Sequence, residues 1–398
     1  MHIQGGMQTS KYSIVIWDKV EDIDRPAWES VRDPDDLFMD PRMLRATADS
    51  LAESDSFSFV LVRDPDGRPV AVTCLWRCTV EGTLLAQEHW MIRAVKHAAQ
   101  FLATVNVHRV LICGMPISVG RSNLRFAPGA DKSQILQILN DKLEAIARAE
   151  RLRCVIFKEF EAHELDFSDA LQELGYKRAH SLPMNQSNPS SKSLSEHLAK
   201  VNSKRRSQIN ASRRKLNSGA VRLVVTSDPD EVAELYTDEV HRLYHAVLGK
   251  TETRLETLSA EFFRNLSRTF PENTTYCFIL DGESVCAFGV VFCSGRVAYP
   301  LYVGVDYELN QEYDLYFNAM YAMLDASLRR GVELISWGQT ADQFKKLKLD
   351  CYQTPRYFYL KGTNWLMSAV INFLFSRLFP ARDIPVPAEE TSTVRRAA

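Results

Sequence analysis

Acidic and tyrosine side chains lie on both sides of one predicted turn. Asp306 and Glu308 follow an apolar run that is typical of a strand, and Tyr313 and Tyr316 begin a helical stretch. Carboxylates can take a proton from an attacking group, and phenols can give one to a leaving group. Asp306 and Glu308 are therefore candidate bases, and Tyr313 and Tyr316 candidate acids. Each residue also has a structural alternative. Asp306 and Glu308 could be solvated turn residues, and Tyr313 and Tyr316 could be core residues.

A basic run occupies the middle of the chain, with no acidic residue between Glu196 and Asp228. Its cations are Lys200, Lys204, Arg205, Arg206, Arg213, Arg214 and Lys215. Such a run is commonly a solvated helix face, but a phosphate-bearing ligand needs cations, as anionic lipid and tRNA also do. We take Lys204, Arg205 and Arg206 as candidate phosphate ligands.

A third group of polar residues follows the apolar run 332–337. Gln339, Thr340 and Lys345 come directly after this predicted strand, where a ligand pocket is expected to open. We take them as candidate ligand-binding residues. Thr340 has a second interpretation, because with Gln343 it fits a capping box at the start of a short helix.

Length and composition favour a two-domain globular protein. The chain has 398 residues, 45% of them hydrophobic and 25% charged, with a net charge of −2. A single core rarely extends over so many residues. The eight cysteines lie in apolar runs without zinc-ligand spacing, so we expect buried thiols and no metal site. The first residues lack the pattern of a signal peptide, and no apolar run reaches 18 residues, so we expect a cytoplasmic protein.

The order of predicted elements in the first half recurs in the second. Each half has a strand, a helical region, three strands, a long helix, a strand, a short helix and a last strand. Asp-Gly-type turns at 64–67 and 281–282 predict a hairpin in each half. Apolar stripes predict long helices over 135–146 and 313–328, the second ending at Gly331. Residues 86–105 occur only in the first half and are interpreted as an insertion.

This repeat predicts an α/β protein, with an α+β type of mixed sheet, built as two similar domains joined by a basic helix. We expect an N-terminal domain over 10–188, a basic helical linker over 189–219 and a C-terminal domain over 220–362. An amphipathic segment over 363–380 and a disordered tail over 381–398 complete the predicted organisation.

The element order resembles that of the GNAT superfamily of acyltransferases, and the tandem arrangement is similar to its FemAB-like members. The resemblance covers residues 10–362. It is most specific in the second half, at 302–306 (YVGVD), at 313–317 (YDLYF) and at 338–340 (GQT) with Lys345.

The resemblance implies where an acyl donor would bind. In the GNAT fold, a backbone N–H of the fourth strand polarises the acyl carbonyl, and the start of the following helix binds phosphates. These positions correspond to 302–306 and 310–313. One departure is clear, because residues 308–312 (ELNQE) replace the glycine-rich turn that usually wraps the coenzyme A pyrophosphate. The first half has a related but shifted turn at 125–133.

The leading expectation is an N-acyltransferase that uses acyl-CoA as co-substrate, with no permanently bound cofactor, and an amine acceptor. One alternative is a Fem-type aminoacyltransferase that uses aminoacyl-tRNA. Another is a catalytically silent double-GNAT module that binds a lipid or a partner protein. The apolar segment 364–379 is too short to span a bilayer but suits an interface. We therefore expect peripheral contact with the inner membrane face, which would fit a lipid-like, sphingoid-type amine.

Overall fold

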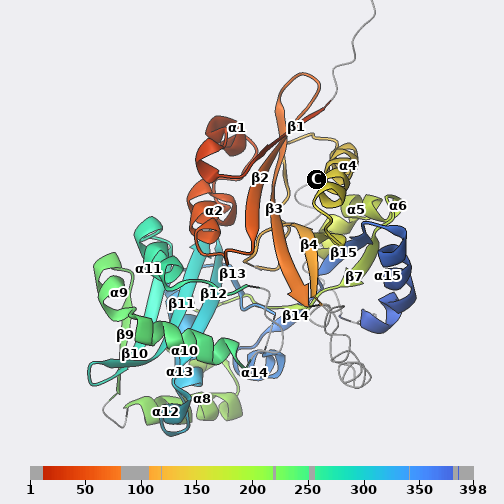
Figure 1. The fold of residues 1–398 in the computed structure, drawn as a ribbon. Coiled ribbons are helices and arrows are strands. Elements are labelled where there is room, and N and C mark those ends of the chain that lie inside the picture. The colour runs from red at the N-terminus through yellow and green to blue at the C-terminus, as the bar shows by residue number, and fades with distance from the viewer. Residues whose placement is uncertain are drawn as a thin grey trace, which may run out of the picture.

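The computed structural model describes residues 12–81, 107–117, 119–217, 221–250, 256–339, 341–379 and 384. The predicted insertion 86–105 lies outside the described residues, and so does the predicted tail except for residue 384. The described chain forms two mixed sheets with helices on their faces, which confirms the predicted α/β class (Figure 1).

The first sheet has the strand order β1-β2-β3-β4-β6-β15-β7, with β5 beside β3. Its strands are β1 (Ser13–Trp17), β2 (Ser56–Arg63), β3 (Pro69–Glu81), β4 (Val107–Cys113), β5 (Arg125–Phe126), β6 (Cys154–Phe160), β7 (Lys177–His180) and β15 (Tyr357–Gly362). The helices of this half are η1 (Val20–Asp22), α1 (Arg25–Glu29), η2 (Leu37–Met39), α2 (Pro41–Ala48), α4 (Lys132–Ala149), η4 (Ala162–Glu164), α5 (Leu165–Ser168) and α6 (Ala170–Glu173). The predicted β2–β3 hairpin and the long helix are both confirmed.

The second sheet has the order β14-β8-β13-β12-β11-β10-β9. Its strands are β8 (Met184–Ser187), β9 (Val221–Thr226), β10 (Thr274–Asp281), β11 (Ser284–Ser294), β12 (Val297–Val305), β13 (Leu334–Ser336) and β14 (Tyr352–Thr354). The remaining helices are α7 (Leu194–Lys200), α8 (Ser203–Asn217), α9 (Pro229–Leu235), α10 (Asp238–Leu248), α11 (Ala260–Thr269), α12 (Tyr307–Tyr313), α13 (Leu315–Arg329), α14 (Asp342–Lys348) and α15 (Trp365–Leu378). The predicted β10–β11 hairpin, the strand β12 and the end of α13 before Gly331 are confirmed.

The two halves exchange strands near their ends. β15, from the end of the chain, lies between β6 and β7 of the first sheet, and β8, from the first half, lies between β13 and β14 of the second. The expected last strand of the first half, β7, stays in the first sheet, but the expectation that the second half keeps its last strand, β15, is wrong. An apolar run specifies that a strand is buried but not which sheet edge receives it. The domain limits 10–188 and 220–362 remain a prediction, and neither span alone contains a complete sheet.

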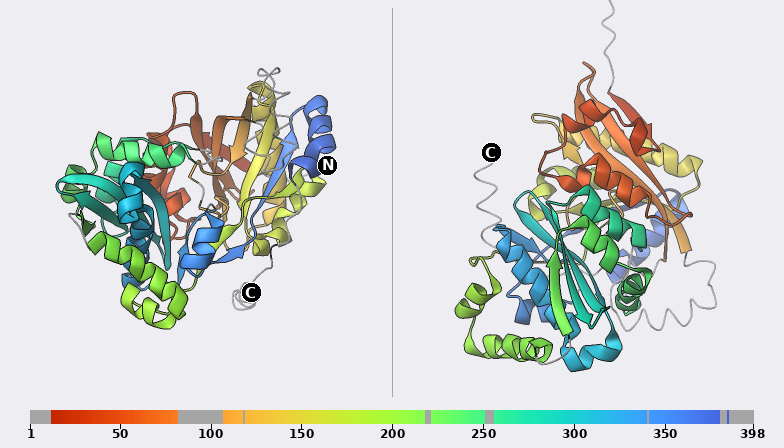
Figure 2. Two further views of the ribbon diagram at one scale, coloured as in Figure 1. Left: turned by 90° about the horizontal axis from the view of Figure 1, so that it is seen from below. Right: turned by 90° about the vertical axis from the view of Figure 1, so that its left-hand side faces the viewer.

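The main hydrophobic core is shared by both halves. Phe38 of η2 packs edge-on against Tyr299 of β12, with ring centroids 4.9 Å apart, and against Phe292 of β11 at 5.3 Å. The backbone N–H of Leu37 donates to the Ser294 hydroxyl at 2.9 Å. Figure 2 shows the two halves side by side, and β8 and β15 join them because each lies in the sheet of the other half. The halves are thus packed as one body.

The basic helix α8 is part of the second half. Ile209 is fully buried, and the Asn318 side chain of α13 donates to the Ser212 carbonyl at 2.9 Å. At the start of α14 the prediction needs a correction, because the N-cap is Ala341 in a left-handed conformation rather than Thr340, which lies outside the described residues. The cysteines are all buried and free, as expected.

Gly304 on β12 allows α10 to approach the sheet closely. A Cβ atom at this position would lie 2.2 Å from Phe288 Cε1 and 2.8 Å from the backbone nitrogen of Tyr244. Because a backbone atom cannot move aside cheaply, we expect Gly304→Ala to lower the free energy of unfolding by about 1–3 kcal/mol. Thermal unfolding measures the effect. Gly249→Ala is the matched control, since its nearest atom is 3.4 Å away, and an equal loss in both variants would contradict the prediction.

Candidate active site

An opening lies between β12 and β13. The two strands pair only at Val297–Leu334 and Ala298–Ile335, whereas β12 continues to Val305. Within the described residues, the edge of β12 beyond Ala298 therefore has no strand partner on this side. β12 also carries a bulge at Leu301, where the register with β11 shifts. Unpaired backbone N–H groups at such an edge can donate to an acyl carbonyl.

The end of β13 is held by a strand of the first half. The Asn185 side chain of β8 donates to the Gly338 carbonyl at 3.0 Å and to the Asp342 carboxylate at 2.8 Å. The Asn185 carbonyl accepts from the Trp337 backbone N–H at 2.8 Å. Asn185 is fully buried, and the sequence offered no signal for it. The strand exchange thus completes one wall of the opening.

Lys345 of α14 is buried close to the end of β13. Its Nζ atom lies 3.8 Å from the position that a Cβ atom on Gly338 would take. Burial lowers its pKa to about 8, against the opposing influence of Cys351 and Asp342. A lysine with such a pKa is often functional, because it can exchange a proton near neutral pH.

The candidate acids and bases lie around α12. The Asp306 carboxylate caps this helix and accepts from the Glu308 backbone N–H at 2.8 Å, while Glu308 is exposed. Tyr313 ends α12 and is partly buried. Tyr316, in the first turn of α13, contacts the Phe344 ring at 5.6 Å, and burial raises the pKa of its phenol to about 12. Tyr316 therefore lies beside α14, whereas Asp306 and Glu308 lie at the opposite end of α12.

The starts of both long helices are occupied by the protein's own side chains. The Asp131 carboxylate caps α4, accepting an N–H of its first turn at 2.9 Å. At α13, the Asn310 side chain accepts the Tyr316 N–H at 2.8 Å, and Asp314 pairs with Lys215 at 2.9 Å. An anion would meet a carboxylate at either helix start. The position that the resemblance assigned to phosphates, 310–313, is thus unfavourable for them.

The candidate cations of α8 lie next to α14. Arg205 pairs with Asp350 at 2.7 Å, and Arg206 donates to a backbone carbonyl at 3.4 Å. Lys204 is exposed. Burial, and then the charges of Arg205 and Lys204, lower the pKa of Lys348, so these three cations share one surface. We call Lys204, Arg205 and Lys348 the α8–α14 basic surface.

Gln339 connects the opening to the first half. Its side chain donates to Glu159 of β6 at 2.9 Å and to the Leu182 carbonyl at 3.0 Å. Thr340, the neighbouring candidate, lies outside the described residues. Sequence analysis missed Glu159 and its neighbour Lys158, although two charges inside the apolar strand 154–160 are an unusual feature that could have drawn attention.

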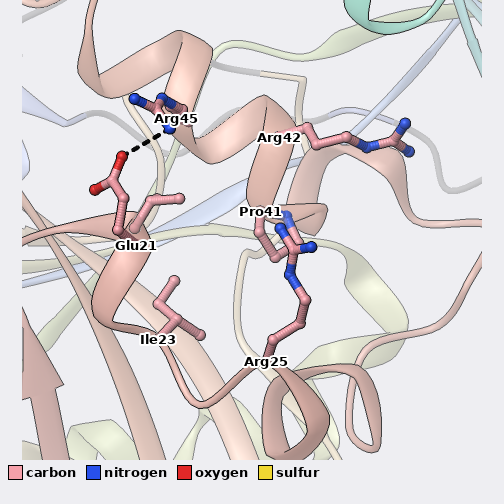
Figure 3. A pocket seen from close by; sticks show the side chains of 7 residues that line it. Glu21, Ile23, Arg25, Pro41, Arg42 and Arg45 are labelled. Carbon is pink, nitrogen blue, oxygen red and sulfur yellow. Dashed lines mark ion pairs between the residues drawn. The ribbon is translucent and has the colours of Figure 1, made fainter.

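A surface hollow next to α2 does not contribute to this site. It has a volume of about 240 Å³, and its arginines Arg25, Arg42 and Arg45 are exposed (Figure 3). Arg45 pairs with Glu21 at 2.9 Å, and Arg42 with Asp40 at 2.9 Å. In the part of the chain that the structure describes, no group of His, Cys, Asp and Glu side chains could hold a metal ion. None of the described helices is long and apolar enough to cross a membrane.

Comparison with known proteins agrees with this architecture. Residues 203–346 match the family model of the acetyltransferase (GNAT) domain. No curated protein sequence matches the chain. The match lies within the second half, and the β12–β13 opening lies within the matched residues.

Three solved structures are similar to this chain in fold. The C-terminal domain of a putative lysylphosphatidylglycerol synthetase from Agrobacterium fabrum has 10% identity and a TM-score of 0.49, with coverage of 91% of this chain and 99% of that one. A tandem GNAT protein from the clavulanic acid biosynthesis pathway has 11% identity and a TM-score of 0.47, with coverage of 89% and 99%. FemX has 12% identity and a TM-score of 0.48, with coverage of 83% and 92%. TM-scores below 0.5 carry no argument about function.

Proposed function

We propose that the protein is an N-acyltransferase that transfers an acyl group from acyl-CoA to an amine at the β12–β13 opening. The observation that carries the proposal is the unpaired edge of β12 beside the Leu301 bulge, with the buried Lys345 nearby. The amine nitrogen attacks the thioester carbonyl, the carbon–sulfur bond breaks, and an amide and a thiol form. N–H groups of β12 would stabilise the oxyanion that develops.

The proton transfers remain proposals for named residues. Asp306 or Glu308 would take the proton of the amine, directly or through water, and Tyr313 or Tyr316 would protonate the leaving thiolate. The contact of Tyr316 with Phe344, next to Lys345, supports Tyr316 more than the other three. Lys345 and Gln339 would contact the donor, as Thr340 would.

The donor phosphates would bind the α8–α14 basic surface instead of the start of α13. Lys204, Arg205 and Lys348 supply three cations there, and Arg206 lies on the same helix. The carboxylates at the starts of α4 and α13 favour a second candidate, a Fem-type aminoacyltransferase, because aminoacyl-tRNA needs no pyrophosphate-binding turn.

Calorimetric titration with coenzyme A, acetyl-CoA, a long-chain acyl-CoA and an aminoacyl-tRNA tests the donor. We expect acyl-CoA to bind and the double variant Lys204→Ala/Lys348→Ala to weaken binding at least about tenfold, because each charged hydrogen bond contributes about 1.5–3 kcal/mol. Arg214→Ala is the control, since it removes an exposed cation about 15 Å further along α8. Binding of aminoacyl-tRNA alone would favour the Fem-type reaction, and binding of no donor would leave a silent module.

The helix α15 supports a lipid-like, sphingoid-type acceptor at a membrane surface. Four of its large apolar side chains are exposed, namely Trp365, Leu366, Val370 and Phe373. They lie on one side of the helix, while Ile371 and Phe375 face the body of the protein. An exposed apolar face of this kind suits insertion into the headgroup region of a membrane.

A further inference from the structure

Lys158 is a buried cation in the core between the halves. It lies on β6, where Ile156 and Lys158 face the shared core. The exposed fraction of the whole residue is only 7%. Its Nζ atom is inaccessible to solvent and has no hydrogen-bond partner among the residues that the structure describes. The Trp76 ring centroid lies 5.7 Å from it. Burying an ammonium group that makes no hydrogen bond costs several kcal/mol, and contact with an aromatic ring offsets only about 2 kcal/mol of this cost, so packing alone does not explain this residue.

Charged and polar residues near Lys158 are also close to β12. Burial raises the pKa of the Glu256 carboxyl, and the nearby charge of Lys158 opposes this shift. Burial, and then the charge of Glu256, raise the pKa of Tyr302, the residue after the Leu301 bulge. Glu256 is therefore close enough to feel the charge of Lys158 and to influence Tyr302 on β12.

The first sheet opens at this same point. β4 and β6 pair up to Cys113 and Phe157, and β6 then continues through Lys158 and Glu159 paired, among the described strands, only with β15 on its other side. Gly114 turns away with a φ of 147°, and a Cβ atom there would lie 3.1 Å from the Lys158 Cγ atom. The ends of β6 and β13 face each other across the Gln339–Glu159 hydrogen bond.

We propose that Lys158 binds an anionic group of the acceptor, a carboxylate or a phosphate, and that Glu256 lies next to the acceptor's amine. The acceptor is then an amine that also carries an anionic group, and it enters between the halves while the donor occupies the opening from the α14 side. The identification of this ligand as the acceptor rests on the proposed acyl transfer. Its physical basis, a buried cation that makes no hydrogen bond within the described part of the chain, is independent of the donor.

Thermal unfolding and calorimetry with three small amines test the assignment without any acyl donor. The probes are β-alanine, which carries a carboxylate, O-phosphoethanolamine, which carries a phosphate, and propylamine, which carries no anion. We expect one or both of the first two to stabilise the protein, and the larger effect identifies the anionic group. Propylamine is expected to have no effect. Equal stabilisation by all three, or by none, would overturn the proposal.

Lys158→Met should be more stable than the natural protein without ligand and should lose at least about tenfold in affinity for the effective probe. Lys158→Gln serves as a second variant of more similar polarity. Lys132→Met is the control, because Lys132 also lies over aromatic rings but is exposed at the start of α4. A destabilised Lys158→Met variant with unchanged probe affinity would show a structural role. Probe binding without donor binding would leave this site standing and the acyl transfer refuted.

Discussion

A chain that ends at residue 355 is expected to have an unfolded first half, although only the last 43 residues are missing from its 398. This truncation removes β15, the strand between β6 and β7, with the buried side chains Phe358, Tyr359 and Leu360. At about 2 kcal/mol for each buried side chain, the loss is roughly 6 kcal/mol, which is comparable to the stability of a whole domain. Limited proteolysis with mass spectrometry should show early cleavage in the first half.

A chain that ends at residue 363 is the control for this truncation. It lacks α15 but keeps β15 and its pairing with both neighbours. It also keeps Arg356, which is 1% exposed and donates to the Gly120 and Pro355 carbonyls. We expect this chain to fold and to unfold in one transition. Equal resistance of both truncated chains to protease would show that β15 is dispensable for the first sheet.

The repeated local structure could be predicted from the sequence because it depends on neighbouring residues. The turns at Asp64–Gly67 and Asp281–Gly282 specify hairpins through left-handed glycines, with φ of 82° at Gly67 and 59° at Gly282. The stripe that begins at Ile135 specifies one helix face, and this face is buried. Such signals act within about ten residues, and they were sufficient for the order of the elements.

The exchange of β8 and β15 could not be predicted, because it depends on which of two similar sheet edges a strand meets. The run 357–360 is apolar and would suit either sheet. Arg356 shows which sheet β15 joins only in the folded protein, where it pairs with Glu161 of the first half at 3.2 Å. The candidate site has the same limit. Lys345 was found because it follows a motif, whereas Asn185 acts through contacts more than 150 residues away in the chain and Lys158 lies against Trp76 of another strand.

The shared core and the exchanged strands together explain why the candidate site belongs to both halves. Asn185 of β8 donates a hydrogen bond to the Gly338 carbonyl after β13, and Gln339 donates one to Glu159 of β6. A movement of the first sheet relative to the second would break the Gln339–Glu159 contact. The opening in the second half is therefore held in place by the first half, which gives the repeat a role beyond adding a second copy of the fold.

Lys345→Met is expected to make the protein more stable at neutral pH and to abolish acyl transfer. In the folded protein, burial lowers the pKa of Lys345 to about 8, whereas an unfolded chain has the ordinary value of 10.5. The unfolded state then binds more protons between pH 8 and 10.5, so this group makes stability rise with pH in that window. Below pH 8 the folded protein bears the full cost of the buried charge, up to about 3 kcal/mol at 1.36 kcal/mol per pKa unit.

Urea unfolding at pH 7 and at pH 9.5 measures this effect. The advantage of Lys345→Met over the natural protein should be largest at pH 7 and should shrink at pH 9.5, because the natural lysine is then mostly neutral when folded. Lys346→Met is the control, since it removes an exposed lysine from the same helix. We expect Lys345→Met to lose at least about 100-fold in acyl transfer and Lys346→Met to keep it. A Lys345→Met variant that is less stable at both pH values would mean that the lysine is structural, because a buried charge kept for chemistry weakens the fold that holds it.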